Sequence, residues 1–164
     1  MVGSYAAGLT MNVPRLPAPG ETQLGSGYWF EHGGKGSNQE AGCARLGANV
    51  QLVAWIGSDA FGDAALELHQ QEGIDAAHGT RMPEASTGVG FIMVESATGH
   101  NLIGLDPGAN GMLSPHDVVR CAQAITQSQV LLAQLEIPVS AAAGTLGQQH
   151  RTPRSDPLLV TWWG

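Results

Sequence analysis

Apolar runs of strand length alternate along this chain with segments of helical spacing, and glycine-rich turns separate them. Residues 49–57 predict a strand, and 60–72, whose apolar residues recur at helical spacing, predict a helix that ends near Gly73. Residues 130–135 form an apolar run typical of a buried parallel strand, after a helix opened by Ser114 and Pro115. Consecutive strand-helix-strand units build an open sheet with helices on both faces, and we therefore predict an α/β fold.

One pair of segments predicts antiparallel pairing. Residues 87–95 and 100–105 flank a turn at 96–99 and predict a hairpin. Because an antiparallel hairpin does not join a parallel sheet readily, we expect it to form a small antiparallel β-lid over the ligand site.

Two further strands are predicted near the start of the chain. Residues 2–12 predict a strand with its continuation, residues 22–31 predict another, and the proline- and glycine-rich stretch 16–20 separates them.

Length and charge exclude several classes of protein. The 164 residues suffice for one domain or a piece of one, and 43% hydrophobic against 13% charged residues excludes charge-driven disorder. A net charge of −7 with scattered basic residues argues against a nucleic-acid partner. No run approaches the roughly 20 apolar residues that cross a bilayer, and the N-terminus lacks signal-peptide character. We expect a cytoplasmic protein without a membrane partner.

Metal binding is also disfavoured. The two cysteines, Cys43 and Cys121, fall in segments of helical character, and their spacing matches no metal site. The histidines include no closely spaced pair, and we expect them on the surface or in turns; they are His32, His69, His78, His100, His116 and His150.

The last 21 residues break the alternation. An α/β chain should continue with a helix after Pro138 and then a strand, which only residues 158–163 could supply. We therefore divide the chain into residues 1–143, which include the lid, and an atypical tail at 144–164. A reading-frame shift or gene-end rearrangement is our hypothesis for the origin of this tail.

The most glycine-dense stretch, 33–38 (GGKGSN), holds the single lysine, Lys35. Either Ser37 or Asn38 is expected to cap a helix that runs to about residue 46. Backbone open to close approach, one cation and the positive end of a helix suit a hydroxyl-rich or anionic ligand. The stretch is no Walker A loop, and the absence of Gly-x-Gly-x-x-Gly disfavours a dinucleotide-dependent oxidoreductase. A glycine-rich turn with an exposed lysine is the alternative.

Collinear segments resemble the PfkB carbohydrate kinase family, and within it the ribokinase-like branch. The resemblance covers roughly residues 2–143. Its segments, in chain order, are 15–22 (RLPAPGET), 33–39 (GGKGSNQ) continuing to 44–48 (ARLGA), 57–62 (GSDAFG), 87–89 (TGV), 107–110 (PGAN), 113–115 (LSP) and 131–138 (LLAQLEIP).

This resemblance implies transfer of the ATP γ-phosphoryl group to a sugar hydroxymethyl group, with ATP and Mg²⁺ as cofactors of the full-length family. It also implies a homodimer that pairs through the β-lid. The implied sugar-binding residues are Gly33, Gly34, Lys35, Asn38 and Glu136, and the implied lid-face residues are Gly90, Ile92 and Leu105. From its position alone, Glu136 could instead cap the helix that follows it.

Two differences from the family pattern bear on activity. Many ribokinases carry an asparagine and an aspartate just after the opening strand, where this chain has SYAAGL at 4–9, which argues against ribose as the substrate. The chain also lacks an Asp-Thr-x-Gly-Ala-Gly-Asp pattern, and Asp156, followed by Pro157, reads as a loop residue. We therefore expect this chain to be the sugar-binding half of a truncated kinase. It should contain no catalytic residue, bind ATP and Mg²⁺ poorly and be inactive alone. The alternative is a non-catalytic, lid-bearing regulatory protein that pairs with an intact kinase.

Overall fold

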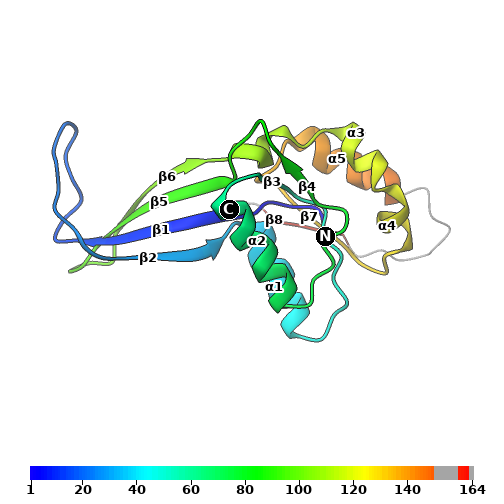
Figure 1. The fold of residues 1–164 in the computed structure, drawn as a ribbon, viewed down its shortest axis with the longest axis horizontal. Helices are drawn as coiled ribbons and strands as arrows, with labels where there is room; N and C mark the ends of the chain where they lie inside the picture. The colour runs from blue at the N-terminus through cyan, green and yellow to red at the C-terminus, as the bar shows by residue number, and fades with distance from the viewer. Residues whose placement is uncertain (150–158, 163–164) are drawn as a thin grey trace.

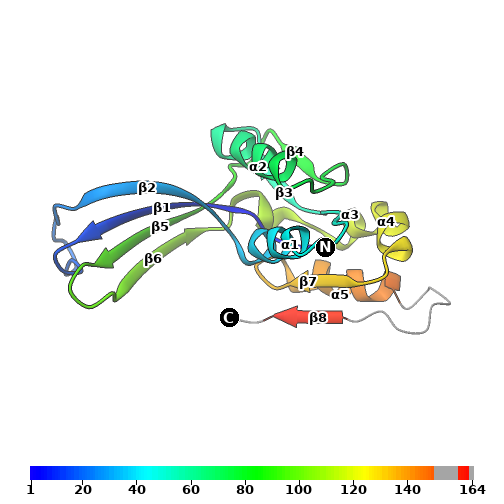
Figure 2. The ribbon, with the colours of Figure 1, turned by 90° about the horizontal axis from the view of Figure 1, so that it is seen from below.

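The computed structural model describes residues 1–149 and 159–162, and it consists of a parallel sheet with flanking helices and a second sheet that projects from one end (Figures 1 and 2). This arrangement confirms the predicted α/β fold with a lid. The elements are β1 (Ala6–Val13), β2 (Ser26–Gly33), α1 (Lys35–Arg45), β3 (Trp55–Gly57), α2 (Ala60–Gln71), β4 (Thr80–Met82), β5 (Gly88–Glu95), β6 (Asn101–Asp106), the 3-10 helix η1 (Gly108–Met112), α3 (Pro115–Arg120), α4 (Ala122–Gln127), β7 (Leu131–Gln134), α5 (Val139–Gln149) and β8 (Leu159–Trp162).

The parallel sheet is held together at its centre by the first residues of the chain. Strand β3 pairs with β4 and β7 pairs with β8, both in parallel. Val2 bridges the two pairs, because it forms parallel bridges to Val53, just before β3, and to Ala133 of β7. All of these residues are buried, as expected for a sheet covered on both faces.

The projecting sheet, called the lid below, has the strand order β2-β1-β5-β6. The predicted hairpin is confirmed as β5 and β6, which pair antiparallel, and β1 and β2 form a second antiparallel pair. The central pair, β1 and β5, is parallel, with Gly8 opposite Gly90. This pairing was not foreseen, because β1 and β5 belong to different hairpins and their register is set by tertiary packing.

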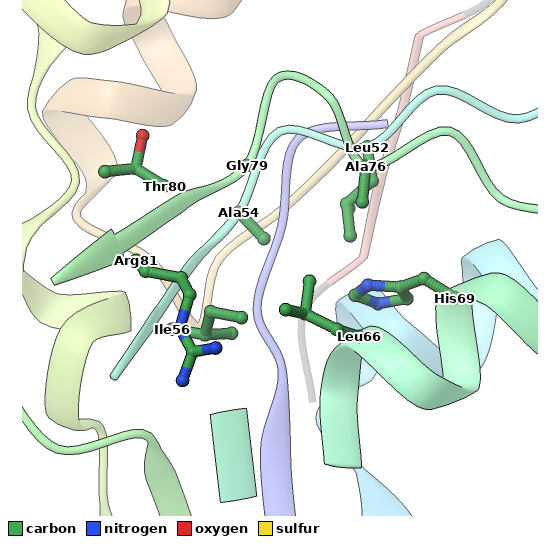
Figure 3. Close-up of a pocket in the computed structure, with 9 residues that line it drawn as sticks. All are labelled: Leu52, Ala54, Ile56, Leu66, His69, Ala76, Gly79, Thr80 and Arg81. Carbon is green, nitrogen blue, oxygen red and sulfur yellow. The ribbon is translucent and has the colours of Figure 1, made fainter. Parts of the chain in front are cut away.

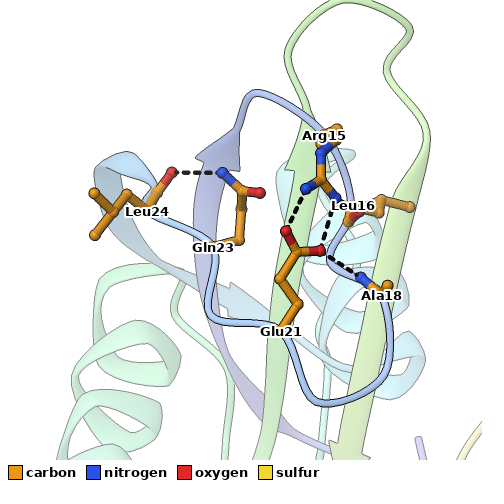
Figure 4. Close-up of polar contacts among 6 residues, drawn as sticks. All are labelled: Arg15, Leu16, Ala18, Glu21, Gln23 and Leu24. Atoms are coloured by element: carbon orange, nitrogen blue, oxygen red, sulfur yellow. Dashed lines mark hydrogen bonds and ion pairs between the residues drawn. The ribbon is translucent and has the colours of Figure 1, made fainter.

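The stretch predicted as a turn between the first two strands is closed by an exposed ion pair (Figure 4). The Arg15 guanidinium donates to both oxygens of Glu21, and the Ala18 amide donates to Glu21 Oε2 at 3.0 Å. These hydrogen bonds, that from Arg15 first, lower the pKa of Glu21 to about 2. Proline fixes the backbone of this turn, and the ion pair links its two ends.

Two apolar clusters pack against the parallel sheet. The larger one, which includes Val2 and Leu131, lies between the sheet and α3, α4 and α5, and a smaller one of Tyr5, Ile56, Ala65 and Leu68 lies beneath α2. Beside α2 is a cavity of about 40 Å³, lined mainly by apolar residues (Figure 3). A space of this volume holds a few water molecules and is too small for a monosaccharide.

His69 corrects the expectation that the histidines lie on the surface or in turns. It is buried in α2, and its Nε2 lies 2.9 Å from Oε1 of Glu40, a fully buried residue of α1. Burial raises the pKa of Glu40, and contact with His69 opposes this effect. The pair links α1 to α2 across the interior, where an unpaired carboxylate would be costly.

Local capping rules succeed at α3 and fail at α1. Ser114 caps α3 with Pro115 in the first turn, as the sequence predicts, and the structure adds Asp117, which completes a capping box with Ser114. Helix α1 instead begins at Lys35, with Gly34 as its N-cap, so the predicted caps Ser37 and Asn38 lie inside the helix. That prediction was wrong because the acceptors for the first amides of α1 come from distant parts of the chain.

The two elements that an α/β chain requires are present: α5 follows Pro138 and extends across residue 143, and β8 lies within the tail. Residues 150–158, which include Asp156, lie outside the described residues, so the division at residue 143 and the frame-shift hypothesis stay predictions. In the described part of the chain, no helix combines the length and the hydropathy needed to cross a membrane.

Candidate functional site

The N-terminus of α1 meets the ends of two other segments, and these supply acceptors for its first three amides. The amide of Lys35 donates to Glu136 Oε2 at 2.8 Å. The amide of Gly36 donates to Ser4 Oγ at 3.3 Å, and that of Ser37 donates to the Ser4 carbonyl at 2.8 Å. Glu136, just after β7, therefore caps α1, and the alternative that it caps the following helix is not what the structure shows.

Two glycines allow this close approach. Gly34 has φ +92, and a Cβ there would lie 2.9 Å from the backbone nitrogen of Ala6. A Cβ at Gly36 would lie 2.4 Å from the backbone nitrogen of Ser4, closer than any real contact. The glycine-rich stretch is thus required by backbone packing as well as by any ligand.

The charged groups of this site form a compact set. Lys35 Nζ lies 3.3 Å from Glu136 Oε1, and Ser4 Oγ donates to Glu136 Oε2 at 2.8 Å. Burial acts to raise the pKa of Glu136, but the hydrogen bonds from the Lys35 amide, from Ser4 and from the Lys35 side chain outweigh it and lower the pKa. An ionised carboxylate beside an ammonium group therefore faces the surface, with side chains 25% and 42% exposed.

The remaining predicted residues lie around this set. Gly33 ends β2 and leads directly into the site, and Asn38 is exposed one turn after Lys35 in α1. The structure thus brings Gly33, Gly34, Lys35 and Glu136 together, while the Asn38 side chain makes no hydrogen bond within the described residues. The Glu136 carboxylate and the Lys35 ammonium group are both partly exposed, and such groups can bind the hydroxyl groups of a polar ligand.

The predicted lid residues share one side of the lid. Gly90 lies opposite Leu105, and a Cβ at Gly90 would lie 3.9 Å from Leu105 and 4.0 Å from Ile92. Ser4 precedes Gly8 by an even number of residues, so in an extended chain both lie on the same side. Ser4 contacts Glu136, and Gly8 lies opposite Gly90. We therefore call the side of the lid that carries Gly8 and Gly90 the Ser4 face.

The other side of the lid packs against α2 and is called the α2 face. Tyr5 Oη lies 2.9 Å from His32 Nδ1, and the ring of Phe30 stacks on that of Phe61 in α2. These contacts cover the part of the α2 face that lies next to α2, so a ligand at the Lys35 and Glu136 site meets the lid on its Ser4 face.

Three supporting residues were missed by sequence reasoning. Asn110 accepts from the Tyr5 amide at 3.1 Å and donates to the Tyr5 carbonyl at 2.7 Å, which clamps the start of the lid. Asp59 accepts from the amide and the hydroxyl of Thr87 at 2.8 and 2.7 Å. These residues belong to motifs singled out in the sequence, but only their meeting in space shows that they join the lid to the parallel sheet.

The described residues contain no group of three or more histidine, cysteine, aspartate or glutamate side chains that could hold a metal ion.

Comparison with known proteins places this geometry in context. Residues 1–161 match the model of the pfkB family carbohydrate kinases. A ribokinase of Haemophilus influenzae is 40% identical over 140 residues, which cover 85% of this chain and 45% of the relative. A ribokinase of Mus musculus is 35% identical over 152 residues, covering 93% and 47%. The chain spans about half the length of the curated relatives it matches.

Solved structures give the same result. A ribokinase from Thermotoga maritima superposes with a TM-score of 0.83 and 31% identity, covering 98% of this chain and 50% of that one. An Arabidopsis thaliana ribokinase, determined with ribose and ATP, superposes with a TM-score of 0.79 and 27% identity over 98% of this chain and 51% of that one.

Proposed function

This chain belongs to the pfkB family of carbohydrate kinases, and from that premise we propose that it forms the sugar-binding half of a ribokinase-type kinase. The observation that carries the proposal is the meeting of Lys35, Ser4 and Glu136 at the N-terminus of α1, beneath the Ser4 face of the lid. Charged donors and acceptors at one open site suit a molecule rich in hydroxyl groups.

In this proposal each group has a role in positioning the sugar. The Lys35 ammonium donates to a sugar oxygen, and the Glu136 carboxylate, ionised at neutral pH, accepts from a hydroxyl group. The apolar side chains of Ile92 and Leu105 cover the bound sugar from the lid, which keeps water away from the acceptor hydroxyl. Such orientation contributes to phosphoryl transfer even though it supplies no reacting group.

Phosphoryl transfer itself needs groups that this site does not supply. The transition state requires a base and a stabilised phosphoryl group, and ATP with Mg²⁺ delivers that group in the full-length family. The sequence lacks the Asp-Thr-x-Gly-Ala-Gly-Asp pattern that carries the base in the family. We therefore propose that the 164-residue chain binds a sugar but does not phosphorylate it.

Binding and turnover are tested separately on the 164-residue chain. Ligand-observed NMR with a panel of pentoses and hexoses should detect binding that Lys35→Ala weakens by about tenfold or more. Arg45→Ala, which removes a cation at the other end of α1, is the matched control and should bind as the parent does. A coupled assay should show no ATP consumption that depends on sugar; sustained turnover with any sugar would refute the proposed inactivity.

A regulatory role is a second candidate, supported by apolar residues exposed on the lid. Phe91 is 57% exposed and Leu102 is 46% exposed, both on the α2 face beyond its contact with α2. Exposed apolar strands favour association, so we propose that this face pairs lids, either in a homodimer or with an intact kinase. Phe91→Glu should then abolish the dimer in sedimentation, whereas a monomeric parent that also fails to co-purify with an intact kinase would exclude both forms.

A further inference from the structure

The Ser4 face of the lid presents a single carboxylate among its paired positions, and the proposed sugar-binding set does not include it. Glu31 of β2 lies opposite Gly8 of β1, and Gly8 lies opposite Gly90 of β5. Beyond Gly90 the face continues with the apolar side chains of Ile92 and Leu105. One acidic group therefore stands at the edge of a face on which its neighbours are glycine, Thr10 and apolar residues.

The Glu31 carboxylate is held in place by Thr10 of the neighbouring strand β1. Thr10 Oγ1 donates to Glu31 Oε1 at 2.8 Å, and Thr10 is only 3% exposed. Glu31 itself is exposed, and its second oxygen, Oε2, accepts no hydrogen bond from the described residues. The buried donor fixes one oxygen of Glu31 and leaves the other available to a ligand. The Glu31 side chain therefore has less conformational freedom to lose when a ligand binds.

Glycine at position 8 allows the Glu31 side chain to lie against strand β1. A Cβ at Gly8 would lie 2.8 Å from Glu31 Cγ, so the Glu31 side chain lies across the space that a side chain at position 8 would fill. A Cβ at Gly90 would make ordinary van der Waals contacts with Leu105 and Ile92, at 3.9 and 4.0 Å. Glycine at both positions keeps any further side chain from standing between a ligand and the carboxylate.

Glu31 is also close to the Lys35 and Glu136 site along the chain. It precedes Gly33 by two residues in β2, a spacing of about 7 Å in an extended strand. Both residues lie on the Ser4 face, because Gly33 lies opposite Ala6 and Glu31 lies opposite Gly8. A ligand that contacts Lys35 and extends along β2 therefore reaches Glu31.

We infer that Glu31 accepts hydrogen bonds from hydroxyl groups of the bound sugar, and that it determines which pattern of hydroxyl groups this chain prefers. This inference rests on the proposed function, since it assigns a further contact to the same sugar. Thr10 is a positioning residue, which acts only through Glu31. A carboxylate that loses its hydroxyl partner stays desolvated without compensation, so a deoxy sugar should be disfavoured.

The test compares sugars that differ by one hydroxyl group. Ligand-observed NMR titration first identifies the pentose or hexose that the 164-residue chain binds best, and then measures its monodeoxy analogues. Glu31→Ala and Glu31→Gln should weaken binding of the parent sugar by about tenfold or more and remove the discrimination against one deoxy analogue. Thr10→Val should cause a smaller change of the same pattern, while Glu84→Gln, an exposed glutamate in the loop after β4, should change nothing.

The outcomes separate this inference from the proposed function. If Lys35→Ala weakens binding but both Glu31 variants bind and discriminate as the parent does, the inference is wrong and the proposed function stands. If no sugar binds the parent chain, the proposed function fails and the inference fails with it. If the Glu31 variants lose affinity for all sugars equally, with discrimination unchanged, Glu31 has only a structural role and the inference is overturned.

Discussion

Glu136 caps a helix that begins 101 residues earlier in the chain, and this single side chain connects the parallel sheet with the glycine-rich stretch. Its two oxygens contact the Lys35 amide, the Lys35 ammonium and the Ser4 hydroxyl. The same carboxylate therefore serves both stability and proposed sugar binding, which is why its removal should affect both.

Glu136→Gln should lower the free energy of unfolding by about 1 to 2 kcal/mol at pH 7, because a charged acceptor is lost. The pKa of Glu136 is lower in the folded state than its ordinary value of 4.5. Its contribution is therefore fully present above that value and is lost as the pH falls through the lower folded value. Urea unfolding should show parent and variant converging in acid; a difference that persists unchanged at low pH would contradict this assignment.

At the scale of elements, the packing of α1 against the start of β1 depends on backbone contact without an intervening side chain. Gly36 lies against Ser4, and Gly34 lies against Ala6. On the other side of α1, the buried pair of Glu40 and His69 joins the helix to α2. Helix α1 is thus positioned from two sides, and its N-terminus has little freedom to move relative to Glu136.

Gly36→Ala should destabilise the chain by about 1 to 3 kcal/mol, because the added Cβ would overlap the Ser4 backbone, which cannot move aside. Gly42→Ala in the same helix is the matched control, since a Cβ there meets nothing within 4 Å. The control should stabilise the chain by roughly 0.5 to 1 kcal/mol, the usual gain for alanine in a helix. Thermal unfolding of both variants measures this difference; equal effects would show that α1 does not pack as described.

For the whole molecule, the lid and the parallel sheet are joined by a few residues near the start of the chain. Val2 belongs to the parallel sheet, and Ala6 already belongs to the lid. The contacts of Asn110 with Tyr5 and of Asp59 with Thr87 lie at this junction. The lid therefore extends from the parallel sheet as a separate layer, and its own strand pairing must hold it together.

Hydrogen exchange should distinguish the central strands of the lid from its edge strands. Strands β1 and β5 have a neighbour on each side, so their amides should exchange more slowly than those of β2 and β6, which lie at the edges of the lid. Every residue of β6 is exposed, which should make it the fastest. Mass spectrometry of the 164-residue chain in deuterated buffer measures this, and uniform rapid exchange across residues 50–135 would mean that this half does not fold unaided.

Much of the fold could be predicted because its signals are local. The alternation of apolar runs, the hairpin at 87–105 and the helix start at Ser114 and Pro115 depend on neighbouring residues, and all three are confirmed. The start of α1 could not be predicted in this way. Its caps are Glu136 and Ser4, and the nearer polar residues Ser37 and Asn38 lie inside the helix.

Local patterns were enough to predict the α/β class, the lid hairpin and the importance of the stretch around Lys35, because periodicity and glycine content act over a few residues. The folded chain was needed to show that Glu136 and Ser4 complete that site, that His69 is buried against Glu40, and that Glu31 lies across Gly8. These contacts join segments far apart in the chain, and they depend on strand register and helix packing, which no local pattern specifies.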